Sequence, residues 1–294
     1  MKIVLATDGS EYSKEAAAFL TRFNWSGNDQ ISVVHAVCWI PFQYDEEYYL
    51  NTLKEIKQEI APRILDATLD VLKPVQAKIS VAIIEDPPEQ GIVQAAADSH
   101  ADMIVMGARG VKGLASFFVG SVTRKVAVTS PKSVLVVRPS AMGPGSMKIL
   151  FAADGSGYSC AAGALLSQIP IPDATEITIM HVIWPKFSDI PERFAAEIND
   201  RINEVAVIAR EKEVKESESI IAKAREQLTS RFKHVHTLTA VGDPSTELLR
   251  AAEIMHADLI VVGCRGLQGM KGMLGSVSRN VLAHARCSVL IGKR

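Results

Sequence analysis

The sequence predicts an α/β protein built from two tandem, doubly wound domains, each with a five-stranded parallel sheet and helices on both faces. Two observations support this fold class. Short apolar, β-branched segments alternate with amphipathic helical segments along the whole chain, which is typical of parallel sheets. The second half of the 294-residue chain then repeats the first half in the same order.

The repeat is visible in four pairs of segments. KIVLATDGS at Lys2 matches KILFAADGS at Lys148, and VVHAV matches IMHVI. HADMIVMGARG matches HADLIVVGCRG, and VGSVTRKV matches LGSVSRNV. The offset between the copies is 146 residues at Asp8 and 156 at Gly107, so about ten residues are added in the middle of the second copy, which we place around Glu204 to Arg231.

The junction between the copies, RPSAMGPGSMK, is rich in Pro, Gly and Ser and has no apolar periodicity. We therefore predict a first domain over residues 1–140, a linker over 141–146 and a second domain over 147–294. Because the linker is short, we expect the two domains to pack against each other.

The first copy begins with strand Lys2–Thr7, an apolar run that ends at a Gly-Ser turn. Helix Glu11–Phe23 has apolar residues at helical spacing. Strand Ile31–Val37 precedes a long helix, Glu46–Leu72, which we expect to kink near Pro62.

Strand Lys78–Ile84 then leads into helix Pro88–Ser99, which starts with Pro where its missing N–H costs nothing. The remaining elements are strand Asp102–Met106, loop Gly107–Phe118, helix Ser121–Thr129 and strand Ser133–Val137. The second copy repeats this order, with a long charged helix over Pro191–Phe232. Its i,i+4 charge pairs are typical of a solvated helix face.

Composition limits the class of protein. The chain is 48% hydrophobic and has a net charge of −1, so it offers no basic field for nucleic acid. No apolar stretch approaches the roughly 18 residues of a membrane span, and the N-terminus has no signal-peptide pattern. The four cysteines form no CxxC pair. We therefore expect a cytoplasmic protein without nucleic-acid or membrane partners.

The candidate site lies at the ends of strands. Asp8 and Asp154 follow the first strand of each copy, and Gly107 and Gly263 follow the fourth. In doubly wound sheets, ligands bind at the carboxyl ends of the strands beside the point where strand order reverses. Both features should therefore meet at the same end of each sheet.

The loop of the first copy has the spacing of a phosphate cradle. Gly107 and Gly110 are followed after nine residues by Gly120 and Ser121, which begin a helix. Glycine lets the backbone approach a phosphate closely, and a helix N-terminus presents free N–H groups to an anion. Arg109 and Lys112 add positive charge.

These motifs resemble the universal stress protein family in its tandem two-domain, ATP-binding form, and the resemblance covers essentially the whole chain. It implies an adenine nucleotide α-hydrolase-like fold that holds ATP, with Mg²⁺ as a candidate companion. It assigns Asp8 to adenine or ribose, Ala36 to the adenine pocket, and the loop and helix start to the phosphates and ribose. The implied set is Asp8, Ala36, Gly107, Gly110, Gly120, Ser121 and Val122, and in the second copy Asp154, Val182, Gly263, Gly266, Gly275, Ser276 and Val277. We add Arg109 to the first set because of its charge.

The second loop departs from the pattern, because only eight residues separate Gly266 from Gly275. The missing residue is either absorbed in the stretch from Gly269 to Gly272 or misplaces Gly275. We therefore favour the first copy for ATP. The alternative is that the glycines only permit a tight turn in copies that bind nothing.

Other candidates are more simply structural. His35 and His181 are flanked by apolar residues, so a core or pocket-edge position is favoured over a catalytic base. Met103 and Met106 fit a buried strand. Cys264 is a candidate redox thiol beside the loop. Glu85-Asp86 and Gly242-Asp243 precede Pro and fit a turn and helix cap.

The predicted function is a non-catalytic or very weakly catalytic ATP-binding protein of stress response or regulation. The sequence has no P-loop motif and no kinase signature. A slow ATPase or nucleotide-transferring enzyme and a nucleotide-free interaction module remain the alternatives. The last strands, Ser133–Val137 and Ser288–Ile291, can pair as edges. The resemblance implies a pseudo-dimer within the chain through them, and a homodimer of whole chains stays open.

Overall fold

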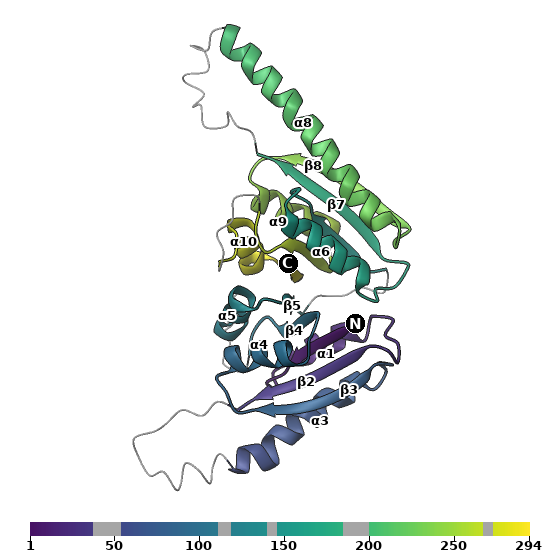
Figure 1. The fold of residues 1–294 in the computed structure, drawn as a ribbon, viewed down its shortest axis with the longest axis vertical. Helices are drawn as coiled ribbons and strands as arrows, with labels where there is room; N and C mark the ends of the chain where they lie inside the picture. Colours follow the sequence, from purple (N-terminus) through teal and green to yellow (C-terminus); the bar gives the residue numbers. More distant parts are fainter. Residues whose placement is uncertain (38–53, 111–118, 140–145, 185–199, 267–272) are drawn as a thin grey trace, which may run out of the picture.

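The computed structural model describes residues 1–37, 54–110, 119–139, 146–184, 200–266 and 273–294. Its strands form one ten-stranded sheet in the order β3-β2-β1-β4-β5-β10-β9-β6-β7-β8 (Figure 1). The strands of the first half are β1 (Lys2–Ala6), β2 (Gln30–Ala36), β3 (Lys78–Ile84), β4 (Met103–Gly107) and β5 (Ser133–Val137). Those of the second half are β6 (Lys148–Ala152), β7 (Glu176–Ile183), β8 (His234–Val241), β9 (Leu259–Gly263) and β10 (Ser288–Gly292).

Helices cover both faces of this sheet, which confirms the doubly wound α/β fold. One face packs against α1 (Glu11–Leu20), α3 (Ala61–Leu72), α6 (Gly157–Gln168) and α8 (Asp200–Thr229). The other face packs against α4 (Pro88–Asp98), α5 (Ser121–Thr129), α9 (Pro244–Met255) and α10 (Ser276–His284). Each half holds five parallel strands, as the alternation of strand and helix predicts.

The central strands are apolar throughout because both of their faces are buried. In β1, Ile3 and Leu5 face one core and Val4 and Ala6 face the other. β1 lies between β2 and β4, and β6 lies between β7 and β9. Strand order therefore reverses beside β1 and β6, which places a crevice at their carboxyl ends.

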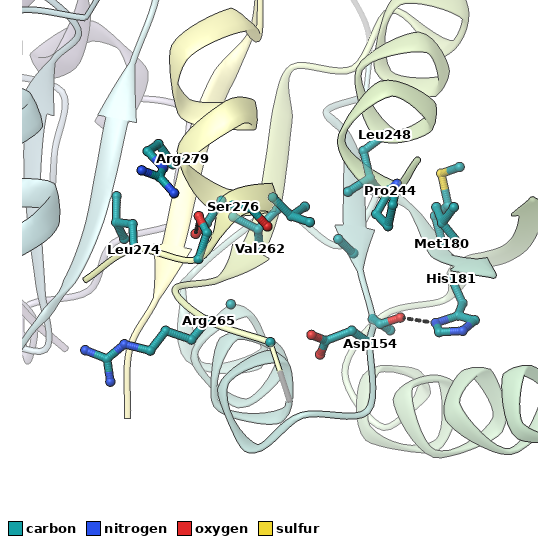
Figure 2. Close-up of a pocket in the computed structure, with 18 of the residues that line it drawn as sticks. Asp154, Met180, His181, Pro244, Leu248, Val262, Arg265, Leu274, Ser276 and Arg279 are labelled. Carbon is teal, nitrogen blue, oxygen red and sulfur yellow. Dashed lines mark hydrogen bonds between the residues drawn. The ribbon is translucent and has the colours of Figure 1, made fainter. Parts of the chain in front are cut away.

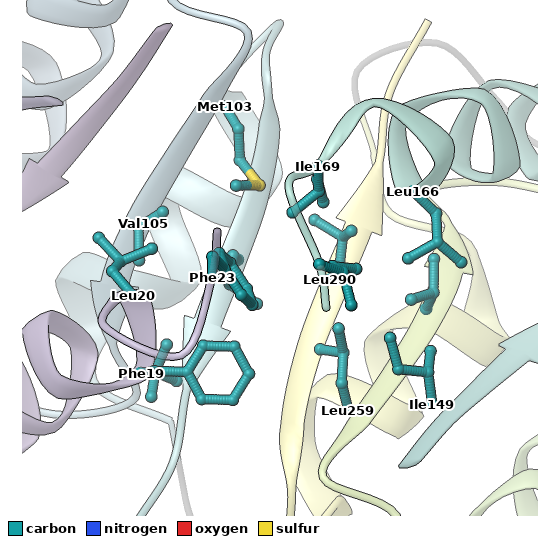
Figure 3. Close-up of a cluster of buried hydrophobic side chains, with 14 of the residues drawn as sticks. Phe19, Leu20, Phe23, Met103, Val105, Ile149, Leu166, Ile169, Leu259 and Leu290 are labelled. Atoms are coloured by element: carbon teal, nitrogen blue, oxygen red, sulfur yellow. The ribbon is translucent and has the colours of Figure 1, made fainter. Parts of the chain in front are cut away.

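The two halves join through their last strands. β5 and β10 pair antiparallel, with Leu135 opposite Leu290, which is the pseudo-dimer that the family resemblance implies. The core on one face continues across this join: Figure 3 shows Phe23 and Met103 of the first half near Ile169 and Leu290 of the second. The halves thus share one sheet and one continuous buried layer.

Reciprocal backbone contacts lock the join. The N–H of Arg138, just after β5, donates to the Ser288 hydroxyl at 3.3 Å. The N–H of Lys293, just after β10, donates to the Ser133 hydroxyl at 3.0 Å. Each half therefore supplies one donor and one acceptor at equivalent positions.

The side chains of the same two residues cap helices of the opposite half. The Arg138 guanidinium donates to the carbonyl of Leu282 in α10 at 2.6 Å, and the Lys293 amine donates to the carbonyl of Ser130 after α5 at 2.5 Å. Cations at helix C-termini satisfy carbonyls that lack helical partners. Burial lowers the pKa of the Lys293 amine to about 8.

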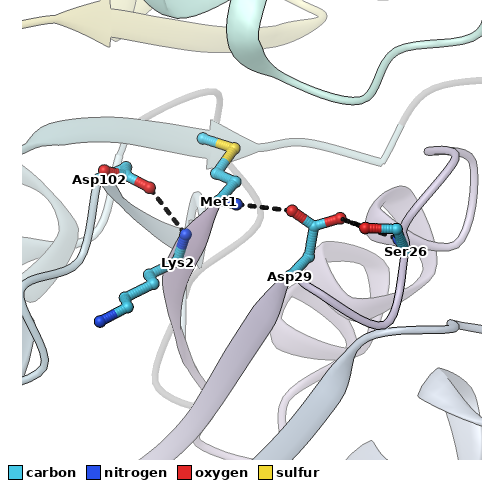
Figure 4. A network of polar contacts seen from close by, with 5 residues as sticks. All are labelled: Met1, Lys2, Ser26, Asp29 and Asp102. Carbon is cyan, nitrogen blue, oxygen red and sulfur yellow. Dashed lines mark hydrogen bonds and ion pairs between the residues drawn. The ribbon is translucent and has the colours of Figure 1, made fainter.

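The N-terminal strand is anchored by carboxylates (Figure 4). The Met1 amine donates to Asp29 at 2.6 Å, and the other oxygen of Asp29 accepts from the N–H and hydroxyl of Ser26. The Lys2 N–H donates to Asp102 at 2.7 Å. Asp102 lies just before β4, so this contact ties the starts of β1 and β4 together.

The first long helix is not α-helical throughout the part that the structure describes. Before α3 the chain forms a π-helical turn, Ile56–Ile60, directly ahead of Pro62. A proline ring conflicts with the preceding turn of an α-helix, so a local change there has a physical reason. The earlier part of the predicted helix, most of the linker and the predicted start of the second long helix at Pro191 lie outside the described residues.

The structure narrows the place of the added residues in the second copy. A Cβ on Gly9 would lie 3.1 Å from Ile64 and a Cβ on Gly155 would lie 3.0 Å from Ile220, so the offset between the copies already reaches 156 at Ile220. The addition therefore lies ahead of Ile220, earlier than the end of the predicted stretch.

The turn before α9 is a helix cap, as predicted for Gly242-Asp243. Asp243 is the N-cap, and its carboxylate accepts from the N–H of Thr246 at 2.8 Å and from the Ser245 hydroxyl at 2.7 Å. The hydroxyl of Ser245, followed by the amide and hydroxyl of Thr246, holds the pKa of the Asp243 carboxyl below its usual value. In the first half, Pro87 stands at this position and supplies no such cap.

We predict that Asp243→Ala lowers the free energy of unfolding by about 1 kcal/mol at pH 7, because α9 loses its cap. The folded pKa is lowered, so this contribution is present above the unfolded pKa and is lost as pH falls through the folded pKa. Urea unfolding of wild type and variant at pH 7 and below pH 4 should show the difference shrinking in acid. Asp243→Asn should keep most of the cap at pH 7; an equal loss from Asn and Ala would contradict this account.

Candidate functional site

The aspartate after the first strand of each half is held by the turn that follows. One oxygen of Asp8 accepts from the N–H of Ser10 at 3.1 Å, and one oxygen of Asp154 accepts from the N–H of Ser156 at 2.9 Å. The glycines between them adopt φ angles of +78° and +74°, which favour glycine. Both serines then cap α1 and α6.

The second carboxylate oxygen of each aspartate lies against the glycine loop. A Cβ on Gly110 would lie 2.3 Å from Asp8 Oδ2, and a Cβ on Gly266 would lie 3.0 Å from Asp154 Oδ2. The structure therefore brings the DGS turn and the glycine loop together in both halves. This is the convergence that the strand ends predict.

The first glycine of each loop has a packing role. A Cβ on Gly107 would lie 2.6 Å from the carbonyl carbon of Tyr12 in α1, and a Cβ on Gly263 would lie 2.7 Å from the Ser159 nitrogen in α6. No side chain fits between the strand end and the helix backbone at these distances. Glycine is needed there whether or not a ligand binds.

The shorter second loop does not displace its last glycine. The N–H of Gly120 donates to Ala108 O at 2.8 Å, and the N–H of Gly275 donates to Cys264 O at 2.8 Å. The two glycines have φ and ψ of −60° and 155°, and −61° and 160°. The missing residue is therefore absorbed before Gly275, which settles the alternative that the sequence leaves open.

Both glycines are N-caps of the helices that follow, α5 and α10. Glycine has no side chain to accept from the first-turn N–H groups, so these donors remain for another partner. In the same half, α6 and α9 start with Ser156 and Asp243, whose side chains accept such bonds. The start of α10 is thus built differently from its neighbours, with a positive dipole end open to the crevice.

A cavity of about 450 Å³ lies at this point in the second half. Figure 2 shows Pro244 and Leu248 on one side, Ser276 and Arg279 on the other, and Asp154 between them. Every residue that the sequence predicts for the second copy lines this cavity: Asp154, Val182, Gly263, Gly266, Gly275, Ser276 and Val277. Its volume is within the usual range for small-molecule pockets.

The lining also includes residues that the sequence did not single out. Met180, Pro244, Leu248 and Val262 make an apolar wall, and Arg279 adds a cation one turn into α10. The apolar residues look like ordinary core positions in the sequence. Only the strand order shows that their ends border a cavity.

In the first half, loop residues 111–118 lie outside the described residues, so Lys112 is not placed. Asp8 and Gly110 adjoin, Gly120, Ser121 and Val122 start α5, and Ala36 ends β2. The preference for the first copy as the ATP site stays a prediction.

The arginine inside each loop is bound to a tyrosine on the first helix. Arg109 donates to the Tyr12 hydroxyl at 3.2 Å, and Arg265 donates to the Tyr158 hydroxyl at 2.7 Å. Each guanidinium also lies over the ring, at 5.4 and 5.2 Å from its centre. Arg265 lines the cavity, and in Figure 2 its side chain extends away from Asp154. The sequence signal for these arginine–tyrosine contacts was a tyrosine two residues after the serine of each DGS turn.

The repeated histidines tie strand ends together. Nδ1 of His35 lies 2.8 Å from Thr7 O, and Nδ1 of His181 lies 2.7 Å from Ala153 O. A carbonyl only accepts, so Nδ1 carries the hydrogen of each contact. His35 is 8% exposed and His181 lines the cavity, in agreement with the predicted core or pocket-edge position.

Cys264 is buried at 3% exposure, and burial raises the pKa of its thiol. A buried, protonated thiol is a poor nucleophile, so the structure does not support the redox alternative. Met103 and Met106 are buried in the core, as predicted.

Two features are absent from the described part of the chain. No three His, Cys, Asp or Glu side chains there are grouped as metal ligands. None of the helices described there has the length and apolar character needed to cross a membrane.

A family model and several known proteins match this chain. The model of the universal stress protein family matches residues 1–138 and again 145–293. A universal stress protein from Thermus aquaticus is 34% identical over 136 residues, which cover 46% of this chain and 97% of that protein. One from Mycobacterium tuberculosis is 25% identical over 303 residues, covering 99% of this chain and 97% of that protein.

The similarity extends to a solved structure. A universal stress protein from Archaeoglobus fulgidus has a TM-score of 0.69 at 21% identity, with 100% of this chain and 98% of that chain covered. At this identity the likeness concerns the fold alone.

We predict that Gly107→Ala lowers the free energy of unfolding by about 1–3 kcal/mol, because the added methyl group meets the α1 backbone. Gly27→Ala is the matched control, since a Cβ there meets nothing within 4 Å, and it should change stability by less than about 0.5 kcal/mol. Urea unfolding measures both. Equal effects of the two substitutions would mean that β4 and α1 are not in contact as described.

Proposed function

This chain belongs to the universal stress protein family, and on that premise we propose that it is an ATP-binding regulatory protein that holds the nucleotide without efficient turnover. The observation that carries the proposal is the uncapped start of α10, which opens onto a cavity with an apolar wall and an aspartate. An adenine nucleotide needs these three environments side by side.

The apolar wall suits the base. Met180, Val182, Leu248 and Val262 come from β7, α9 and β9 and present a surface on which a planar aromatic ring can lie. Pockets of this kind are mostly apolar with a few placed polar groups. In this proposal adenine lies near Val182, at the end of β7.

The start of α10 suits the phosphates. The N–H groups of Ser276 and Val277 are in the first helical turn, where the helix dipole is positive. The Ser276 side chain is exposed and can add a hydroxyl donor, and Arg279 supplies a positive charge at the lining. Gly275 leaves room for the close approach of a phosphate.

Asp154 lies between these two regions and suits the ribose. Its Oδ1 is engaged by the Ser156 N–H, and Oδ2 faces Gly266 at the cavity. A carboxylate oxygen at that place can accept from a ribose hydroxyl. The turn holds the aspartate in one orientation before any ligand arrives.

Two of the polar side chains that line the site, His181 and Arg265, are engaged in positioning. Nδ1 of His181 is bound to Ala153 O, and Arg265 is bound to Tyr158 and to Met273 O. This favours a binding role, in which the nucleotide bridges strand ends and loop and shifts the protein toward an ordered form that a partner reads.

We predict that Ser276→Glu abolishes or weakens ATP binding to the second half at least tenfold, because the new carboxylate faces the phosphates at short range. A glutamate in the first turn is favourable for the helix itself, so the variant should fold. Isothermal titration calorimetry with ATP measures the affinity and the number of sites. Ser276→Ala, which adds no charge, should retain much more of the affinity.

Ser121→Glu is the matched variant at the start of α5 and should remove only a first-half site. No ATP binding by wild type up to millimolar concentrations would contradict the proposal. Turnover of ATP at rates typical of enzymes would contradict its non-catalytic part.

A further inference from the structure

The outermost strand of the second half, β8, lies at one end of the sheet, beside α8 (Figure 1). It pairs with β7 over its whole length, from His234 opposite Glu176 to Val241 opposite Ile183. In the part of the chain that the structure describes, no strand pairs with its other edge. Most of its side chains are exposed, and Leu238 is 38% exposed.

This edge carries none of the usual protection against pairing. The strand sequence HVHTLTAV contains no Lys, Arg, Asp, Glu or Pro, and its register with β7 is unbroken by a bulge. Natural proteins place charges, proline or bulges on edges that must stay free. A long, regular and uncharged edge is therefore a template for another strand.

A groove of about 500 Å³ runs along this edge, between β8 and the outer face of α8. Thr237 and Thr239 line it from the strand. From the helix come residues spaced three and four apart, which form one face: Glu218, Ile221, Ala222, Arg225, Glu226 and Thr229. Strand edge and helix face together make one surface, which we call the β8 surface.

We propose that the β8 surface binds a second copy of this chain, with β8 pairing antiparallel to its own counterpart about a two-fold axis at Leu238. In this register Thr237 faces Thr239 of the second copy, and Val235 faces Val241. Cross-strand Thr–Thr pairs and pairs of β-branched residues are favourable. The interface is isologous, since the same residues serve on both sides.

The charges of α8 complement each other in this arrangement. The two-fold axis sets the two α8 helices antiparallel, centred near Ile221 and Ala222. Glu218 of each copy then lies opposite Arg225 of the other, on either side of this apolar centre. Each copy therefore contributes one Glu218 and one Arg225, and the dimer contains two equivalent ion pairs.

The position of α8 is also compatible. α8 packs on β7 and β8, so in the proposed pairing the α8 helices of both copies lie on the same face of the extended sheet.

The chain already uses this mode of association once. β5 and β10, equivalent strands of the two halves, pair antiparallel edge to edge and keep equivalent helices on the same face of the sheet. Pairing at the β8 surface would extend the same sheet by antiparallel pairing of equivalent edge strands. This proposal does not depend on whether nucleotide is bound.

Sedimentation velocity of the full chain over a micromolar concentration range tests this inference. We expect a species of twice the chain's 31.8 kDa. Leu238→Lys puts a charge on the two-fold axis and should shift the protein to monomer. Val81→Lys is the matched control on the opposite edge strand, β3, where Val81 is 48% exposed, and it should stay dimeric.

Charge exchange in α8 gives a second test that does not touch the strand. Glu218→Arg and Arg225→Glu should each weaken the dimer several-fold, and the double variant should recover it. A monomeric wild type, or dissociation by Val81→Lys and not by Leu238→Lys, would overturn the proposal. So would single charge variants that match the wild type, or a double variant no tighter than the singles.

Discussion

Three residues of β5 face three residues of β10, and this short antiparallel ladder joins two five-stranded parallel sheets into one. Arg138 and Lys293 lock it by capping helices of the opposite half. Because both caps end at the helices that begin with the glycine N-caps, the join also holds α5 and α10 in place. Each half therefore helps to position the helix that borders the candidate site of the other half.

The two copies share the positions of their loop glycines and differ in the side chains packed around them. In the first half, Thr7 bonds to Ser13 and Thr68 in a buried hydroxyl cluster. The second half has Ala153 in place of Thr7, and a further cavity of about 320 Å³ lies there beside Asp154 and α8. The loop deletion, by contrast, leaves Gly275 in the setting of Gly120. The positions of the loop glycines are thus the same in both copies, while the neighbouring side chains differ.

Much of the fold could be predicted because the signals are local and repeated. Alternating elements and duplicated motifs suffice for the layers and for the meeting of Asp154 with Gly266. The join through the last strands was implied by the family resemblance. The Arg265–Tyr158 contact was missed because it joins residues far apart in the chain whose types are common on any surface. The packing role of Gly107 was missed because a glycine that admits a ligand and one that admits a helix look alike in sequence.

The β8 surface could not be predicted from the sequence either, because a strand with the sequence HVHTLTAV could equally lie in the centre of a sheet. Its position at the edge follows from strand order, which is a property of the whole sheet. The same holds for the apolar wall formed by Met180 and Leu248. Residues of this kind acquire a role only through their neighbours in space.

We propose above all that the cavity at the ends of β6 and β9 is a nucleotide site. A crystal structure of the full chain grown with ATP tests it most directly. The account predicts adenine beside Val182, ribose at Asp154 and phosphate oxygens on the N–H groups of Ser276 and Val277. An empty cavity at saturating ATP, or a nucleotide bound elsewhere on the chain, would contradict it.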